Sequence, residues 1–190
     1  MLTLFASKTA IALKLLRRGL SRAGLALGMV LMLTAGLVLG VGGSMLLPDP
    51  AWAYNYSRAI MDGQDFPNDD FSGSNFSMAK LRRSDLTNTN FENANLFGAR
   101  MDDSNLTGAN LREATLDSAL MNRANLTNAD LTGAYAMNTV FDDVIISGAD
   151  FTDVLLEGQV LKGLCELAEG TNPKTGKNTR DTLMCDDMGF

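Results

Sequence analysis

A large apolar residue returns at every fifth position from Phe66 to Leu161, and this period constrains the fold more than any other feature of the chain. Nineteen of the twenty positions carry a bulky apolar side chain, and only Ala136 is small. An α-helix returns to one face after about 3.6 residues and a flat strand after two, so neither can present every fifth residue to a core. The chain must therefore turn a corner every five residues.

A second register of mostly small residues lies two positions before each large one. Its members include Ala79, Ser84, Thr89, Ala94, Ala99, Ser104, Ala109, Ala114, Ala119, Ala124, Ala129, Ala134, Thr139 and Ala149. We expect both registers to point inward, because small residues fit where a core is narrow. A fixed short period of this kind is typical of a protein built from stacked repeats.

The two registers resemble the pentapeptide-repeat family, whose pattern is A(D/N)LxX. The pattern is complete in Ala94-Asn95-Leu96, Ala109-Asn110-Leu111, Ala124-Asn125-Leu126 and Ala129-Asp130-Leu131. The resemblance covers about 100 of the 190 residues and implies an all-β fold, a right-handed quadrilateral β-helix of about five coils. Residues 64–163 would form this helix, and residues 164–190 a short, partly helical C-terminal cap. Residues 54–63 would be its N-terminal lead-in, where an imperfect repeat (Ala59, then Met61) starts the array.

Residues 1–53 have the three-part pattern of an export signal. A basic start precedes an uncharged stretch from Ala23 to Leu47, and Ala51-Trp52-Ala53 places small residues where a signal peptidase reads them. Cleavage is therefore expected before Tyr54. The stretch is long enough to span a bilayer, so a retained N-terminal anchor is the alternative. Arg17-Arg18 resembles part of a twin-arginine signal, and both this route and the general secretory route stay open.

Charge and composition limit the possible functions. Residues 54–190 hold 11 bases and 21 acids, a net charge of about −10. Such a surface repels phosphates, so no nucleic-acid partner is expected, and membrane contact is expected only through the export signal before cleavage. Histidine, the commonest general base and metal ligand, is absent. With no catalytic grouping, cofactor motif or metal motif, the chain is predicted not to be an enzyme.

The outward position before each large residue usually carries Asp or Asn. Calcium needs oxygens that converge on one point, whereas this ladder spreads them along a face, so we expect solvated side chains that bond to turn backbone. Late in the repeat the same register becomes apolar, in what we call the apolar strip: Leu120, Tyr135, Val140, Ile145, Leu155 and Val160. An exposed strip of this kind must be covered or must bind something. Either the C-terminal segment folds back over it, or a second copy or another partner contacts it.

Cys165 and Cys185 are the only cysteines. An even count in an exported chain favours a disulfide, which would close the C-terminal segment and contribute about 3 kcal/mol by the loop-entropy model. The alternatives are a zinc pair, although no other soft ligand is evident, and a redox-active dithiol, although Cys-x-x-Cys is missing. Around Cys165 we expect a short helix that ends at Gly170, followed by a loop from Lys174 to Arg180.

The C-terminal segment is similar to the C-terminal signature of thylakoid lumenal pentapeptide-repeat proteins of cyanobacteria and chloroplasts. Thr171-Asn172-Pro173, Thr175-Gly176 and Thr179-Arg180 lie between the two cysteines. The resemblance implies a lumenal location and a disulfide that thioredoxin-type exchange could address. An export signal without a Ser/Arg-rich transit segment favours a cyanobacterial source, and the periplasm is the alternative compartment.

Three functional hypotheses follow. The first is a non-enzymatic structural scaffold of the thylakoid lumen that binds an unknown lumenal or membrane-associated protein, with a homodimer also possible. The second is a redox-responsive lumenal binding protein, in which opening of the Cys165–Cys185 disulfide uncovers the apolar strip. The third is an acidic DNA mimic that binds gyrase, as some members of the family do, but an export signal would separate such a protein from gyrase.

The small residue Ala136 leads to a prediction about core packing. With twenty residues per coil, Ala136 shares an internal stack with larger side chains, and the ring of the next inward residue, Phe141, is expected to fill the space beside it. Ala136→Leu should overpack this layer and lower the free energy of unfolding by about 1–3 kcal/mol. Thermal denaturation measures this change, and an unchanged Tm would count against the packing hypothesis.

Overall fold

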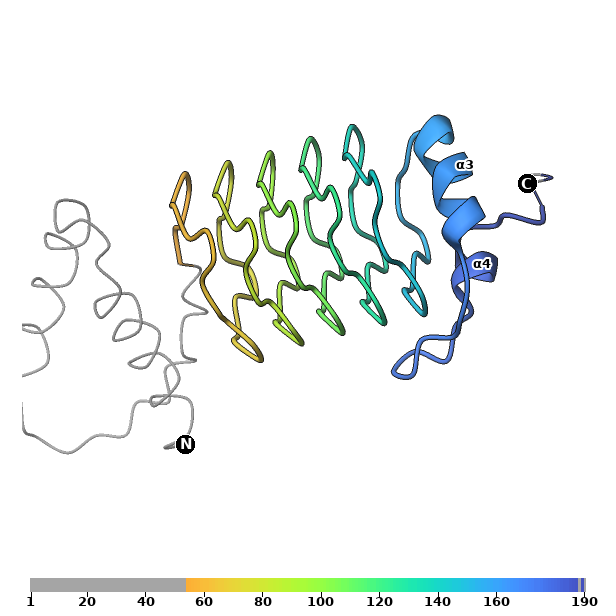
Figure 1. The fold of residues 1–190 in the computed structure, drawn as a ribbon, viewed down its shortest axis with the longest axis horizontal. Helices are drawn as coiled ribbons and strands as arrows, with labels where there is room; N and C mark the ends of the chain where they lie inside the picture. The colour runs from red at the N-terminus through yellow and green to blue at the C-terminus, as the bar shows by residue number, and fades with distance from the viewer. Residues whose placement is uncertain (1–53, 188, 190) are drawn as a thin grey trace, which may run out of the picture. The chain divides into compact units, whose positions relative to one another are not determined.

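The computed structural model describes residues 54–187 and 189. The predicted export signal and its cleavage residues Ala51 and Ala53 therefore lie outside the described residues. From residue 55 onward, parallel β-bridges join each outward residue to the one twenty positions later, from Asn55↔Asn75 to Tyr135↔Leu155. Bridged positions recur every five residues, so four of them complete one turn and the chain winds as a stack of four-sided coils (Figure 1).

Backbone hydrogen bonds between coils form a continuous ladder. In one example Leu96 N donates to Thr115 O at 2.8 Å, and Thr115 N donates to Ala94 O at 3.0 Å. Each bridge involves a single residue on either side, and no longer strand forms within residues 54–187. The fold is thus a β-solenoid made almost entirely of corners and single-residue bridges. No helix of the described residues is long and apolar enough to cross a membrane.

The corners explain the period of five. At every fifth position from Arg58 to Asp153 the backbone has a positive φ, between 53 and 69°. The turn is closed by a hydrogen bond across it, such as Ala99 N donating to Leu96 O at 2.9 Å. A turn with positive φ at its third residue favours Gly, Asn and Asp, and these types fill fourteen of the twenty corner positions. Local turn chemistry therefore bends the chain at a fixed interval.

The large inward residues are buried from Met61 to Phe151, and the small register is buried from Ser74 to Ala149, as predicted. Leu106 and Ala109 are fully enclosed, and Ala136 and Phe141 are 1% and 7% exposed. Several hydroxyls of the small register donate to backbone carbonyls, as when Thr89 Oγ1 donates to Phe66 O at 2.7 Å. These hydrogen bonds allow the narrow interior to hold polar side chains.

Residues 54–63 start the solenoid, because Asn55 and Ile60 already form bridges to the next coil. The predicted C-terminal boundary of the repeat was wrong. Helix α3 (Gly158–Leu167) begins before the predicted last residue of the repeat, Gly163. The apolar residues Val160, Leu161 and Leu164 also fit a helical spacing. A second short helix, α4 (Thr179–Thr182), follows.

The two helices lie at the C-terminal end of the stack (Figure 1). Leu164 and Leu183 are 2% and 3% exposed, so both segments bury apolar side chains. The last coil would otherwise leave backbone donors unpaired, and the cap satisfies two of them. Gly148 N donates to Glu169 O at 2.8 Å, and Phe151 N donates to Thr182 Oγ1 at 3.1 Å. The C-terminal segment thus takes part of the place of a further coil.

One corner carries charges that alternate in sign from coil to coil. Arg82 pairs with Asp62 of the preceding coil at 2.6 Å, and Arg123 pairs with Asp103 through two hydrogen bonds of 2.7 and 2.9 Å. Hydrogen bonds from these guanidinium groups hold the pKa of Asp62 and of Asp103 below the ordinary value. Pairs at a spacing of about twenty residues oppose a shift of one coil against the next.

This charge ladder predicts an acid-sensitive contribution to stability. A depressed carboxyl pKa stabilises the fold above the ordinary value of 3.8, and the contribution is lost as the pH falls below it. Asp62→Asn/Asp103→Asn should therefore show a smaller fall of Tm on acidification than the parent protein. Asp142→Asn is the control, because Asp142 lies on the same corner and forms no ion pair with the described residues. An equal fall of Tm in the double variant and the parent would exclude this role.

Candidate interaction surface

The structure places the apolar strip on three sides of the solenoid. The four sides of the last coil are marked by Tyr135, Val140, Ile145 and Asp150. Leu120 bridges to Val140 and Tyr135 bridges to Leu155, as the predicted stacking requires. Tyr135, Ile145 and Leu155 are 45, 53 and 55% exposed. The exception is Val160, which lies in α3 and therefore does not extend the stack of Leu120 and Val140.

Two exposed apolar residues next to the strip were missed by the sequence reasoning. Phe97 and Met78 are 37 and 50% exposed and occupy the corner between the side of Tyr135 and the side of Val140. The signal was present in the sequence, because an apolar residue is unusual in a corner register that mostly carries polar residues and glycine. They extend the apolar surface toward the N-terminal coils.

The C-terminal segment does not cover the apolar strip, contrary to one expectation. Residues 170–178, which we call the strap, cross the corner between the sides of Ile145 and Asp150. Lys174 Nζ donates to Gly108 O at 2.6 Å, two coils away from the end of the solenoid. Asp130 and Asp150 on the adjacent side are 8 and 2% exposed. The strap therefore lies over part of the Asp/Asn ladder and leaves the strip open.

Asn172 is the central residue of the strap. Its side chain is fully buried, and its Nδ2 donates to Asn128 O and Ala129 O at 3.2 and 3.1 Å. Its Oδ1 accepts from the amides of Lys174 and Thr175 at 2.9 and 3.2 Å. One side chain thus shapes the loop and attaches it to the solenoid, with both its polar atoms satisfied.

A glycine allows the strap to approach the solenoid closely. Gly170 has a φ of +80°, and a Cβ on it would lie 2.9 Å from the backbone N of Gly148. A backbone contact of this kind cannot give way as a flexible side chain can. Gly170 therefore serves this approach and does not end the helix as predicted, since α3 already ends at Leu167.

Asp150 remains acidic although the strap buries it. Burial raises the pKa of a carboxyl group, but hydrogen bonds from Thr152 and Thr175 and the nearby charge of Lys177 outweigh it, so the pKa of Asp150 lies below the ordinary value. Asp150 Oδ1 accepts from the amide and the hydroxyl of Thr152 at 2.9 and 2.6 Å. The Asp/Asn ladder here bonds to turn backbone, as expected, and helps to hold the strap.

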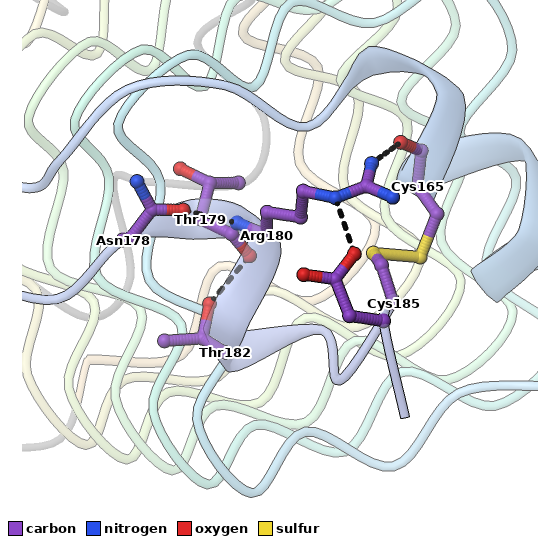
Figure 2. Close-up of a disulfide and its surroundings, with 7 residues drawn as sticks. Cys165, Asn178, Thr179, Arg180, Thr182 and Cys185 are labelled. Carbon is purple, nitrogen blue, oxygen red and sulfur yellow. Dashed lines mark hydrogen bonds and ion pairs between the residues drawn. A yellow bond between two sulfur atoms is a disulfide. The ribbon is translucent and has the colours of Figure 1, made fainter. Parts of the chain in front are cut away.

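The predicted disulfide between Cys165 and Cys185 is present and joins α3 to the segment after α4 (Figure 2). Both cysteines are buried, at 3 and 0% exposure. Figure 2 shows Arg180 reaching from α4 toward this bridge, where its guanidinium donates to Cys165 O at 3.3 Å and to Asp186 Oδ1 at 2.8 Å. The disulfide and Arg180 thus hold α3 and the segment after α4 together. The strap lies between these two segments in the sequence.

A shallow polar hollow lies on the corner between the sides of Val140 and Ile145, one to three coils before residues 142–143. Its volume is about 290 Å³, and it is lined by Arg82, Arg83, Arg100, Asp102, Asp103 and Arg123. Within residues 54–187, no three side chains of His, Cys, Asp or Glu are grouped so that they could hold a metal ion. The described carboxylates follow the faces and corners of the repeat instead of converging on one point.

A comparison with protein families matches the chain to Pentapeptide repeats, in eight copies over residues 57–88, 70–103, 89–123 and 119–158. These segments together cover more than half of the 190 residues. The chain therefore belongs to the pentapeptide-repeat family.

Solved structures of the same kind are found in plants and cyanobacteria. A pentapeptide repeat protein from the thylakoid lumen of Arabidopsis thaliana is 41% identical, over 66% of this chain and 91% of that chain, with a TM-score of 0.49. Rfr23 from the cyanobacterium Cyanothece 51142 is 22% identical, over 55% and 89%, with a TM-score of 0.39. HetL, involved in heterocyst differentiation regulation in Nostoc sp. strain PCC 7120, is 23% identical, over 56% and 53%, with a TM-score of 0.28. No curated protein matches the chain.

The buried amide of Asn172 generates a prediction about the strap. Asn172→Ala removes four hydrogen bonds and leaves buried backbone groups unpaired, which should cost about 1–3 kcal/mol. Hydrogen–deuterium exchange should then show faster exchange in residues 170–178, while the ladder amides of the middle coils stay protected. The control is Gln159→Ala, at an exposed position of α3. Unchanged exchange in the strap would show that Asn172 does not attach it.

Proposed function

We propose that this protein is a right-handed β-helical scaffold of the thylakoid lumen, without enzymatic activity, that binds a lumenal or membrane-associated protein through its apolar strip. The observation that carries the proposal is the exposure of Tyr135 and Leu155, which bridge to each other on one side of the solenoid, at 45 and 55%. The C-terminal strap, which could have covered them, lies elsewhere. Exposed apolar groups that share a surface mark an interaction site when no part of the same chain shields them.

The rigid ladder beneath the strip suits a binding role. Val140 N donates to Ala119 O at 3.0 Å and Tyr135 N donates to Ala114 O at 2.9 Å, so each strip residue stands on backbone that is bonded to the preceding coil. A surface that is already ordered loses little conformational entropy on binding. By contrast, the described carboxylates and arginines are spread along faces and corners, and catalysis would require a convergent set of groups.

The lumenal location rests on the export signal and on the resemblance of the C-terminal segment to lumenal members of the family. A disulfide that is formed and buried fits an oxidising compartment. The proposal also agrees with the compartment in the name of the Arabidopsis protein. Separate isolation of thylakoid lumen, periplasm and cytoplasm tests it, and protein confined to the cytoplasm would overturn it.

The two other hypotheses fit the geometry less well. A redox switch that uncovers the apolar strip requires the strap to lie over the strip, whereas the strap lies over the side of Asp150. A DNA mimic requires a continuous exposed row of acids. Here Asp130 and Asp150 are 8 and 2% exposed, and Asp130 pairs with Arg112 at 3.2 Å. Arginines such as Arg82 and Arg123 also interrupt the acids of a corner.

The proposal predicts the effect of charged residues in the strip. Tyr135→Glu/Leu155→Glu should abolish capture of the partner that the parent protein retains from thylakoid lumen, because two carboxylates would be buried against it. Circular dichroism checks the fold, and Asn95→Glu provides a control on the same side, two coils before Tyr135. Reductant should leave capture unchanged, since the strap does not cover the strip. Equal capture by the double variant, or no specific capture by the parent, would contradict the proposal.

A further inference from the structure

We propose that the partner contributes a segment in which carboxylates stand beside apolar side chains, and that this segment lies along one side of the solenoid. That side, which we call the mixed face, consists of Ile60, Lys80, Arg100, Leu120 and Val140. The inference rests on the proposed function, because it assigns a chemical character to the partner of the same surface.

The mixed face is continuous from its cationic half, Lys80 and Arg100, to its apolar half, Leu120 and Val140. Bridges join Lys80 to Arg100, Arg100 to Leu120, and Leu120 to Val140. Neighbouring coils are about 4.8 Å apart, so the three steps from Lys80 to Val140 span about 14 Å. Four or five residues of an extended partner segment cover this length. One short segment can therefore contact both halves.

Positive charge is concentrated at the cationic half although residues 54–190 are acidic as a whole. Five of their 11 bases lie on the mixed face or on the corner after it: Lys80, Arg82, Arg83, Arg100 and Arg123. Two of these, Arg82 and Arg123, are engaged in close pairs with Asp62 and Asp103.

The remaining cations are available to a ligand. Lys80 and Arg83 form no hydrogen bond or ion pair through their side chains with the residues that the structure describes, and Arg100 has only a 3.7 Å contact with Asp102. Arg83 and Arg100 line the hollow of about 290 Å³ described above. A guanidinium group binds a carboxylate through two parallel hydrogen bonds, so this hollow suits a carboxylate side chain.

The composition of the hollow favours a protein segment over an extended anionic surface. Asp102 and Asp103 also line it, so its four arginines provide a net charge of only about +2. The surrounding surface is acidic and repels a membrane or a polyphosphate that must approach over a wide area. One or two carboxylates on a narrow segment avoid this repulsion.

The apolar half supplies the second part of the recognition. Leu120 and Val140 continue the mixed face, and Tyr135 and Leu155 stand on the neighbouring side at 45 and 55% exposure. Phe97, at the corner between these two sides, is 37% exposed. A partner that places apolar side chains here and a carboxylate at Arg100 would satisfy both halves in one binding mode.

The test uses a library of random 12-residue peptides displayed on phage. Peptides are selected for binding to the protein as its host exports it. We expect enrichment of peptides that carry Asp or Glu within a few residues of Leu, Ile or Phe. Fluorescence anisotropy with the enriched peptides should then show at least about tenfold weaker binding to Arg83→Glu/Arg100→Glu and at raised salt. Leu120→Asp/Val140→Asp should weaken binding to a similar extent.

The variants use residues that the fold already accepts at the same registers. Asp130 occupies the outward register of Leu120 and Val140, and Glu113 occupies the corner register of Arg83 with a φ of 53°. Arg58→Glu/Lys162→Glu is the matched control, because it makes the same change in net charge away from the hollow. This control should bind the peptides as the parent does.

The outcomes separate the inference from the proposed function. Loss of binding only in Leu120→Asp/Val140→Asp, or enrichment of peptides without carboxylates, would overturn the inference and leave the apolar strip as a binding surface. Binding that neither double variant weakens, or no enrichment, would contradict both. Binding to phosphatidylglycerol vesicles that Arg83→Glu/Arg100→Glu abolishes, without peptide binding, would assign the hollow to lipid headgroups and also overturn the inference.

Discussion

The backbone ladder between coils is the interaction on which the rest of this structure depends. It pairs each outward residue with the one twenty positions later, as in Leu126 N donating to Ile145 O at 2.7 Å. A coil of any other length would move the large and small inward registers out of the core. Because the ladder uses backbone atoms alone, it leaves the outward side chains free to differ, and the surface can acquire a function without a change in fold.

The regular part of the fold could be predicted from the sequence because a local cause repeats in it. Corner residues with positive φ and inward residues of fixed size specify each coil without reference to distant parts of the chain. The end of the repeat could not be predicted, because Leu161 keeps the period of five although it lies in α3. Val160, Leu161 and Leu164 suit a helix as well as the repeat. At the start, Met61 is 3% exposed and supplies the core of the imperfect repeat that begins the array.

The apolar strip could be found by register, but the path of the strap could not. The strap is held by contacts between residues far apart in sequence, such as Lys174 with Gly108 and Asn172 with Asn128. Nothing in a local pattern distinguishes the side that these residues reach from the side of Tyr135. Phe97 and Met78 lie in a corner register, and the strip is defined by the register directly before each large inward residue. The exposed apolar surface is therefore wider than the strip alone.

The strap also determines from which end the solenoid frays. The strap attaches to Gly108 and Asn128, and Glu169 just before it attaches to Gly148, so three successive coils are tied together. The last coils therefore cannot detach one at a time without releasing the strap. The first coil has no such tie among the described residues, and stacked repeats open from their weakest end. Thermal opening should therefore proceed from the N-terminal side. Tyr135, Val140 and Leu155 then stand on the part of the molecule that opens last. The proposed interaction surface would therefore stay folded while the N-terminal coils open locally.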